Sequence, residues 1–131
     1  KNYKAVIMFK KFLILFFVLF SFQSFAIEKK TTFTLEAFNE AQKAGKTIVI
    51  NSWNKFCGTC ARQTKILNEA QKDFPDVIFL SYEQTKHKDF AKLLNVEYWA
   101  TIIVYKNSKE VAKEIGITSK SDIYSLIKKE I

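Results

Sequence analysis

Two cysteines separated by two residues, Cys57-Gly58-Thr59-Cys60, are the part of this sequence whose residue types and spacing most directly indicate chemistry. Thiol-disulfide exchange requires a thiolate as the attacking group. A cysteine at the start of a helix has its anion stabilised by unpaired backbone N–H groups and by the helix dipole. Two intervening residues let the second sulfur reach the first around one turn. We therefore expect Cys57 to be the exposed attacking thiol and Cys60 the shielded resolving thiol.

Two other interpretations of the cysteine pair stay open. The pair could be half of a metal site, although Zn²⁺ usually takes four ligands and the only histidine is His87, which has the context of a surface residue. It could be a purely structural disulfide, although closing so short a loop adds little stability. We favour the redox interpretation, for which no metal and no organic cofactor is needed.

The elements next to the cysteine pair follow from the hydrophobic pattern. A buried strand is predicted over Thr47 to Trp53, because Ile48, Val49 and Ile50 form an apolar run. A helix is predicted from Cys57 to about Asp73, with Pro75 as its stop signal. The pair therefore lies where a buried strand leads into a helix.

The rest of the chain alternates between helices and strands. The predicted elements are a helix capped by Thr34 and ending at Ala44, a strand over 77–82, a short helix over 88–94, strands over 101–105 and 110–115 joined by a turn, a helix starting at Ser119, and an optional first strand over 30–33. Their apolar residues, Leu35, Leu93 and Ile131 among them, are expected to face the core. This order predicts an α/β fold with a mixed sheet covered on both faces by helices.

The first 26 residues have the layout of a secretory signal peptide. Lys10 and Lys11 precede nine apolar residues, Phe12 to Phe20, and the small residues Ser24 and Ala26 suit a cleavage site after Ala26. We therefore expect an exported, periplasmic protein whose domain spans residues 27–131. An uncleaved membrane anchor formed by residues 8–26 stays open as the alternative.

Composition and charge exclude several other classes of protein. The chain has 131 residues, 48% hydrophobic and 26% charged, which indicates one globular domain and excludes collagen-like and disordered chains. Four of the net positive charges lie in the first 26 residues, and the remaining residues carry 17 basic and 13 acidic side chains that are scattered. We therefore predict no nucleic-acid partner. We also expect a monomer, although the sequence has no coiled-coil pattern or apolar patch that bears on the oligomeric state.

Two separated segments resemble the thioredoxin family. Residues 49–60, Val-Ile-Asn-Ser-Trp-Asn-Lys-Phe-Cys-Gly-Thr-Cys, resemble the family's strand, tryptophan and active-site segment, and residues 96–107 resemble its substrate loop and hairpin. The resemblance implies a thioredoxin-like fold in which Cys57 and Cys60 form the redox pair. It also implies active-site support from Asn51, Trp53, Phe56, Gly58 and Thr59, and substrate binding by Trp99, Ala100 and Thr101.

Three departures from the family pattern bear on function. Ala100 replaces the usual cis-proline, and because a non-proline cis bond costs about 3–4 kcal/mol, the loop is either trans and reshaped or strained. Asn51 replaces a buried carboxylate and cannot act as a base for the resolving cysteine. Thr59 replaces proline, which adds an N–H and a hydroxyl near Cys57 and favours the thiolate.

The function implied is an exported thiol-disulfide oxidoreductase, more a reductant than an oxidant, acting on protein thiols and disulfides. Such a reductant needs a membrane protein as its electron donor. One alternative is a disulfide-forming oxidant or isomerase, although the helical insertion typical of the oxidants is missing. The other is a non-catalytic metal- or protein-binding module on the same frame.

Overall fold

A computed structural model of the protein describes residues 29–131. The predicted signal peptide or membrane anchor over residues 1–26 lies outside these residues. Within them, no helix combines the length and apolar character needed to cross a membrane.

Four strands form a single mixed sheet in the order β2-β1-β3-β4. They are β1 (Ile48–Trp53), β2 (Ile78–Glu83), β3 (Thr101–Lys106) and β4 (Lys109–Ile115). β1 pairs in parallel with β2, while the β1–β3 and β3–β4 pairs are antiparallel. β1 is buried along its whole length because it lies inside the sheet.

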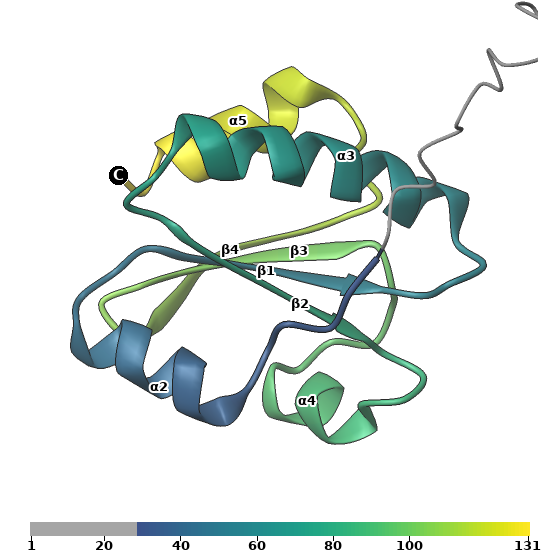
Figure 1. Ribbon diagram of the computed structural model, residues 1–131, viewed down its shortest axis with the longest axis horizontal. Coiled ribbons are helices and arrows are strands. Elements are labelled where there is room, and N and C mark those ends of the chain that lie inside the picture. The colour runs from purple at the N-terminus through teal and green to yellow at the C-terminus, as the bar shows by residue number, and fades with distance from the viewer. Residues whose placement is uncertain (1–28) are drawn as a thin grey trace, which may run out of the picture.

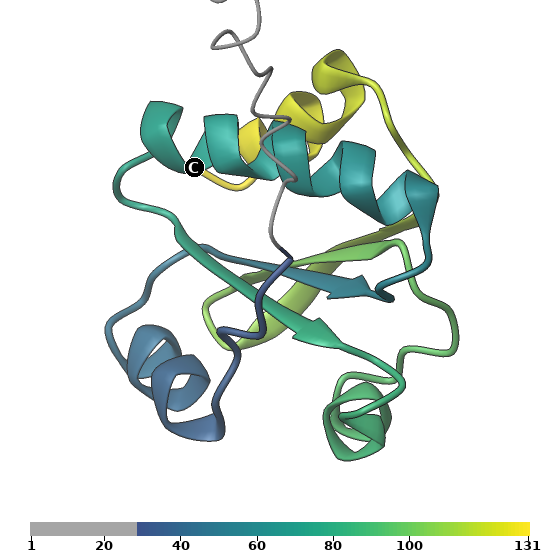
Figure 2. The same ribbon diagram turned by 45° about the vertical axis from the view of Figure 1, so that its right-hand side comes forward.

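Helices cover both faces of the sheet, as Figures 1 and 2 show. They are α2 (Leu35–Lys43), α3 (Gly58–Asp73), α4 (Lys88–Leu93) and α5 (Lys120–Lys128). α3 and α5 lie side by side on one face, and α2 and α4 lie on the other (Figure 1). The predicted α/β fold with a mixed sheet covered on both faces is confirmed.

Alternation along β1 divides the apolar residues into two cores. Ile48 and Ile50 belong to the core under α2 and α4, while Val49 belongs to the core under α3 and α5. Successive strand residues point to opposite faces, so one continuous apolar run supplies both cores. Asn51 and Trp53 follow Val49 on the α3 face and bring a polar and an aromatic side chain towards the start of α3.

The start of α2 corrects one prediction. Thr34 caps the helix, its hydroxyl accepting the N–H of Ala37 at 3.0 Å. Phe33, just before the cap, packs on Phe38 with ring centroids 5.4 Å apart, a hydrophobic staple. Phe33 thereby occupies the core position expected for Leu35, which is 50% exposed.

Two other apolar residues predicted to face the core are also exposed. Leu93 cannot share the core with its neighbour Leu94, because adjacent residues on a helix point about 100° apart, and Leu94 is the buried one. Ile131 lies beyond Lys128, where α5 ends, and is no longer in helical register.

The optional first strand is not a regular strand. Residues 30–33 nevertheless lie along the open edge of β2, where the N–H groups of Thr32 and Phe33 both donate to the Ser81 carbonyl oxygen, at 2.8 and 3.0 Å. The Ser81 N–H donates to the Thr32 hydroxyl instead of a backbone carbonyl. Because the Thr32 hydroxyl takes the place of the backbone carbonyl that would accept this bond in a sheet, residues 30–33 do not pair with β2 as a regular strand.

Candidate active site

Cys57 is the N-cap residue of α3 and follows the loop that leaves the carboxyl end of β1. Its Sγ accepts the backbone N–H of Cys60 at 3.0 Å, as an N-cap side chain does at the third helical position. Cys57 and Cys60 are joined by a disulfide. When that bond is reduced, the same N–H and the positive end of the helix dipole stabilise a thiolate on Cys57.

The two sulfurs differ in their access to solvent. Cys57 is partly exposed, whereas Cys60 is fully buried against Trp53 and Ala100. An attacking thiol must reach a disulfide on another molecule, and a resolving thiol needs to reach only its partner. The geometry therefore fits the roles expected for Cys57 and Cys60. Trp53 lies under the pair, and its indole N–H is buried without a hydrogen-bond partner among the described residues.

Ala100 faces the pair from the loop before β3, and its backbone has an unusual conformation. None of the described peptide bonds is cis, and Ala100 has a φ of 59°, in the left-handed region that residues with a Cβ disfavour. Its N–H donates to the Ser52 carbonyl at 2.8 Å, and its carbonyl accepts the Gly116 N–H at 2.9 Å. The loop is thus trans and reshaped, one of the two outcomes expected for alanine at this position.

A pair of buried amides joins α3 to this loop. The Gln63 side chain, fully buried, donates from Nε2 to the carbonyl oxygens of Ala100 and Ile117, at 3.0 and 2.9 Å. Its Oε1 accepts a hydrogen bond from Asn51 Nδ2 at 3.0 Å, and the same Nδ2 is 3.3 Å from the Thr101 carbonyl oxygen. Asn51 therefore acts as a donor at the position where many thioredoxins carry an acid.

Gln63 was not among the residues singled out from the sequence, although a signal for it exists. The buried residues of α3 are Cys60, Gln63, Leu67 and Ala70, which lie on one face at helical spacing. A glutamine within an otherwise apolar stripe must have partners for its amide. Those partners come from distant parts of the chain, so the stripe identifies the residue and only the fold identifies its partners.

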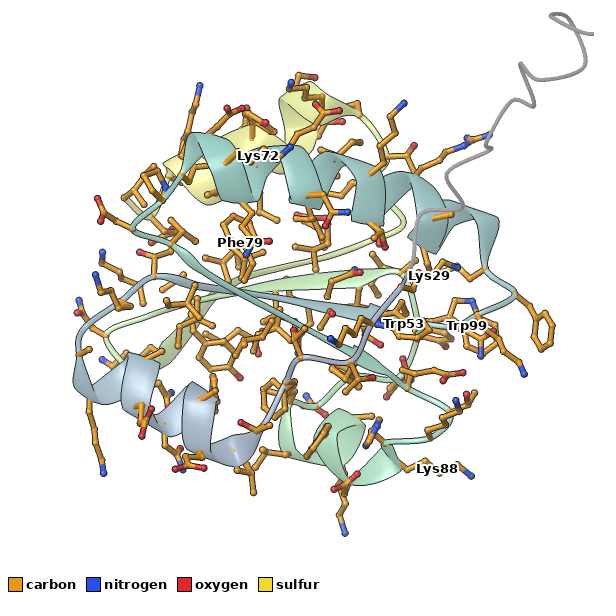
Figure 3. All side chains as sticks on the ribbon, in the orientation of Figure 1. Lys29, Trp53, Lys72, Phe79, Lys88 and Trp99 are labelled. Atoms are coloured by element: carbon orange, nitrogen blue, oxygen red, sulfur yellow. A yellow bond between two sulfur atoms is a disulfide. The ribbon has the colours of Figure 1, made fainter. Side chains whose placement is uncertain are left out.

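Lys29 was also not predicted, and it is bound to the active-site loop. Its Nζ donates to the carbonyl oxygens of Asn54 at 2.9 Å and Cys57 at 3.0 Å, and lies 3.4 Å from that of Lys55. Partial burial lowers the pKa of the Lys29 ammonium, and the negative charge of Glu83 opposes this shift. Figure 3 shows Lys29, Trp53 and Trp99 at the same end of the sheet. The Lys29 ammonium therefore binds the turn that presents Cys57.

Exposed aromatic side chains lie on both segments that flank the cysteines. Phe56, next to Cys57, is 85% exposed, and Trp99, next to Ala100, is 49% exposed. Tyr98 is exposed as well, and the Lys55 ammonium lies 4.8 Å from the centroid of the Phe56 ring. Solvent-exposed aromatics around a reactive group are typical of a contact surface for another protein.

The remaining predicted site residues lie in or beside these segments. Gly58 and Thr59 form the first turn of α3, where Thr59 is half-buried and the N–H that reaches the Cys57 sulfur is that of Cys60. The hydroxyl of Thr101 donates to the Tyr98 carbonyl at 2.6 Å and closes the loop on itself.

A cavity of about 140 Å³ lies between α3 and the edge of β2. Its lining includes Asn51 and Trp53 from β1, Thr64 and Asn68 from α3, and Lys29, which is bound to the active-site loop. Apolar side chains, among them Leu67 and Phe79, line the cavity as well as these polar ones, and an opening of this size has room for a few water molecules.

Within residues 29–131, no group of three or more His, Cys, Asp or Glu side chains is arranged to hold a metal ion. The His87 ring is stacked on that of Phe90, with centroids 4.9 Å apart.

The comparisons with known proteins agree on one family. The family model for thioredoxin matches residues 29–129. The chain is 28% identical to thioredoxin of Mycoplasma genitalium over 71% of this chain and 91% of that one, and 30% identical to an H-type thioredoxin of Oryza sativa over 70% and 75%. The crystal structure of Trxlp from Edwardsiella tarda superposes with a TM-score of 0.69 at 25% identity, covering 72% of this chain and 94% of that one.

Proposed function

Because this chain belongs to the thioredoxin family and is a thiol-disulfide oxidoreductase, we propose that it is an exported member that works as a reductant of protein disulfides. The observation that carries the proposal is the placement of the two sulfurs. Cys57 is partly exposed at the start of α3 with an N–H on its sulfur, while Cys60 is buried one turn behind it. The attack and the resolution are thereby assigned to different thiols.

The reaction transfers two electrons to the substrate in two exchanges. The Cys57 thiolate attacks one sulfur of a substrate disulfide; a bond forms between Cys57 and that sulfur, the substrate bond breaks, and the leaving thiolate takes a proton from water. Cys60 then loses its proton and attacks the Cys57 sulfur. The second substrate thiolate leaves, and the protein retains the Cys57–Cys60 disulfide.

The proton of Cys60 needs an acceptor other than Asn51. An amide has no basic site at neutral pH, and the Asn51 nitrogen is already donating to Gln63 and Thr101. The cavity that Asn51 lines offers a route for water to this part of the site. Water is therefore our choice for the acceptor in the resolving step.

The exposed aromatics provide the surface on which a protein substrate docks. Phe56 and Trp99 flank the cysteines from two loops, and an extended substrate chain lying beside Trp99 brings its disulfide to Cys57. The disulfide-forming oxidants with a thioredoxin-like fold typically carry a helical insertion. Here only a short loop joins α3 to β2, which supports the reductant role. The signal-like layout of residues 1–26 supports export.

The reduction potential of the full chain in glutathione or dithiothreitol buffers tests the direction of electron flow. Trp53 packs on Cys60, so tryptophan fluorescence reports the oxidation state. We expect a value near the roughly −270 mV of a thioredoxin, and a value near −120 mV would show an oxidant instead. Cys60→Ser should accumulate mixed disulfides on Cys57, whereas the matched Cys57→Ser variant should accumulate none. Equal trapping by both variants would contradict the assigned roles.

Export is tested separately by expressing the full chain in a bacterium and fractionating the cells. We expect a protein that begins at Ile27 in the periplasmic fraction. An intact N-terminus in the membrane fraction would show the anchored form, and an uncleaved protein in the cytosol would refute export.

A further inference from the structure

We infer that Gln63 is a positioning residue for substrate docking, whose amide holds the loop of residues 98–101 in the orientation that pairs with an extended substrate. The inference rests on the proposed function, since it concerns how a protein disulfide reaches Cys57. It assigns to Gln63 and Asn51 together the task of fixing a loop that has alanine where the family has proline.

The bonding of Gln63 leaves its amide only one orientation. Two carbonyl oxygens, of Ala100 and Ile117, lie 3.0 and 2.9 Å from the Gln63 nitrogen, and because a carbonyl can only accept a hydrogen bond, the nitrogen and not the oxygen must face them. The oxygen then faces Asn51, which must present its own nitrogen. Every hydrogen-bonding group of the buried Gln63 amide thus has a partner apart from one lone pair of its oxygen, and neither side chain can turn without breaking several bonds.

These bonds connect the redox helix directly to the loop. Gln63 lies three residues after Cys60, one turn along the same face of α3. Ala100 is 37 residues away in sequence and Ile117 is 54 residues away. One side chain therefore links the loop to the helix that carries the cysteine pair.

The loop needs such a contact because its conformation is not a preferred one. Ala100 has a left-handed backbone, which its Cβ disfavours, so the conformation persists only while its contacts hold it. The next residue back, Trp99, makes no backbone hydrogen bond within residues 29–131. Its N–H and carbonyl are therefore available to pair with an extended chain, in the manner of strand addition. Their direction depends on Ala100, and so on Gln63.

The test compares a large and a small substrate in single-turnover reactions of the reduced full chain. The large substrate is a disulfide-linked dimer of a short unstructured peptide, which needs the loop; the small one is bis(2-hydroxyethyl) disulfide, which does not. For Gln63→Leu we expect the rate constant with the peptide dimer to fall about tenfold, the equivalent of one lost buried hydrogen bond. The rate constant with the small disulfide should stay within about twofold.

Gln71→Leu is the matched control, because it makes the same change at an exposed position of the same helix. Both of its rate constants should stay within about twofold, the scale expected of an exposed site. An equal loss with both substrates in Gln63→Leu would show a structural role only and overturn the inference. So would unchanged rates with both. A wild-type protein that reacts with neither substrate would instead refute the proposed function on which the inference rests.

Gln63→Asn covers the case in which the leucine variant does not fold. It keeps an amide but shortens its reach, so the bonds to Ala100 and Ile117 cannot both form. We expect the ratio of the peptide to the small-disulfide rate constant to fall by at least about threefold, for a partial loss of these bonds. A folded Gln63→Asn protein with an unchanged ratio would overturn the inference.

Discussion

The backbone N–H of Ala100 donates to the carbonyl oxygen of Ser52 across 2.8 Å, and this bond ties the loop before β3 to the last residues of β1. A proline at position 100 has no N–H to give. The bond also coexists with a φ of 59°, which the proline ring cannot adopt. The observed trans, left-handed conformation therefore requires a residue other than proline at position 100. The loop differs in this respect from the cis-proline loop usual in the family.

Ala100→Gly should leave the free energy of unfolding within about 1 kcal/mol of the wild-type value. A left-handed alanine costs about 1–2 kcal/mol, and glycine avoids this cost but loses about 0.5–1 kcal/mol of chain entropy and about 0.8 kcal/mol for the methyl group that packs beside Cys60. Ala100→Pro should lower the free energy of unfolding by about 2 kcal/mol or more, because it removes the bond to Ser52 and excludes the observed φ. Urea unfolding of the full chain measures both.

Ala112→Gly provides the control for the glycine substitution. Ala112 lies half-buried in β4 and is not among the residues with positive φ, so glycine there should cost about 0.5–1 kcal/mol. If Ala100→Gly lost more stability than Ala112→Gly, the left-handed conformation of Ala100 would be wrong.

Lys29→Met should lower the free energy of unfolding by about 1 kcal/mol. Methionine keeps the apolar stem but removes the charge that reaches three carbonyl oxygens of the active-site loop. Lys30→Met is the matched control at the next, exposed residue and should change stability by less than about 0.5 kcal/mol. Equal effects of the two substitutions in urea unfolding would show that the contacts of Lys29 add nothing.

Glu83 should contribute to the loss of stability in acid. The hydrogen bond from Lys86, at 2.9 Å, holds the pKa of the Glu83 carboxyl below its ordinary value. A carboxyl with a lowered pKa in the folded state stabilises the protein above its unfolded pKa, and this contribution is lost as the pH falls through the folded pKa. The relevant window therefore begins near pH 4.3 and extends downwards.

The measurement is the thermal midpoint as a function of pH for the wild type and Glu83→Gln. The variant should be the less stable protein at pH 7, and the gap should narrow as the pH falls below about 4.3. A gap that is constant with pH would show that the Lys86 bond does not bias the ionisation of Glu83.

The order of the elements and the cysteine pair were predictable because both depend on local patterns. Apolar runs and helical spacing gave the strands and helices, and the Cys57–Cys60 spacing fixed the chemistry at the start of α3. For Ala100 the sequence predicted only two alternatives, a loop that is trans and reshaped or a loop that is strained. The cost of a non-proline cis bond led to these alternatives but did not decide between them.

Long-range contacts account for what the sequence did not predict. Gln63 interacts with Asn51, Ala100 and Ile117, which come from three other segments of the chain. Lys29 binds backbone carbonyl oxygens, which every residue has, so no residue type in the sequence indicates this contact. Leu35 is exposed, although we expected it to face the core. Phe33, just before the helix, packs on Phe38 and is buried in its place.

Asn51→Asp should destabilise the protein instead of restoring a thioredoxin-like base. The Asn51 nitrogen faces the Gln63 Oε1 and the Thr101 carbonyl oxygen, and a carboxylate there would meet two acceptors while buried. We expect a loss of about 2–4 kcal/mol at pH 7. Burial and the facing oxygens favour the neutral acid and so raise the pKa of the new carboxyl. Its destabilisation should therefore be smallest below the ordinary aspartate pKa of about 3.9 and grow as the pH rises through the folded value.

The double variant Asn51→Asp with Gln63→Leu determines whether the two amides form a matched pair. Removing the glutamine oxygen takes away one of the acceptors facing the new carboxyl, so the second substitution should cost less in this background than in the wild type. We expect an interaction energy of about 1 kcal/mol or more in a double-mutant cycle measured by urea unfolding at pH 7. Additivity within about 0.5 kcal/mol would mean that Asn51 and Gln63 act independently. In that case the donor role of Asn51 would not explain why an acid is absent from this position.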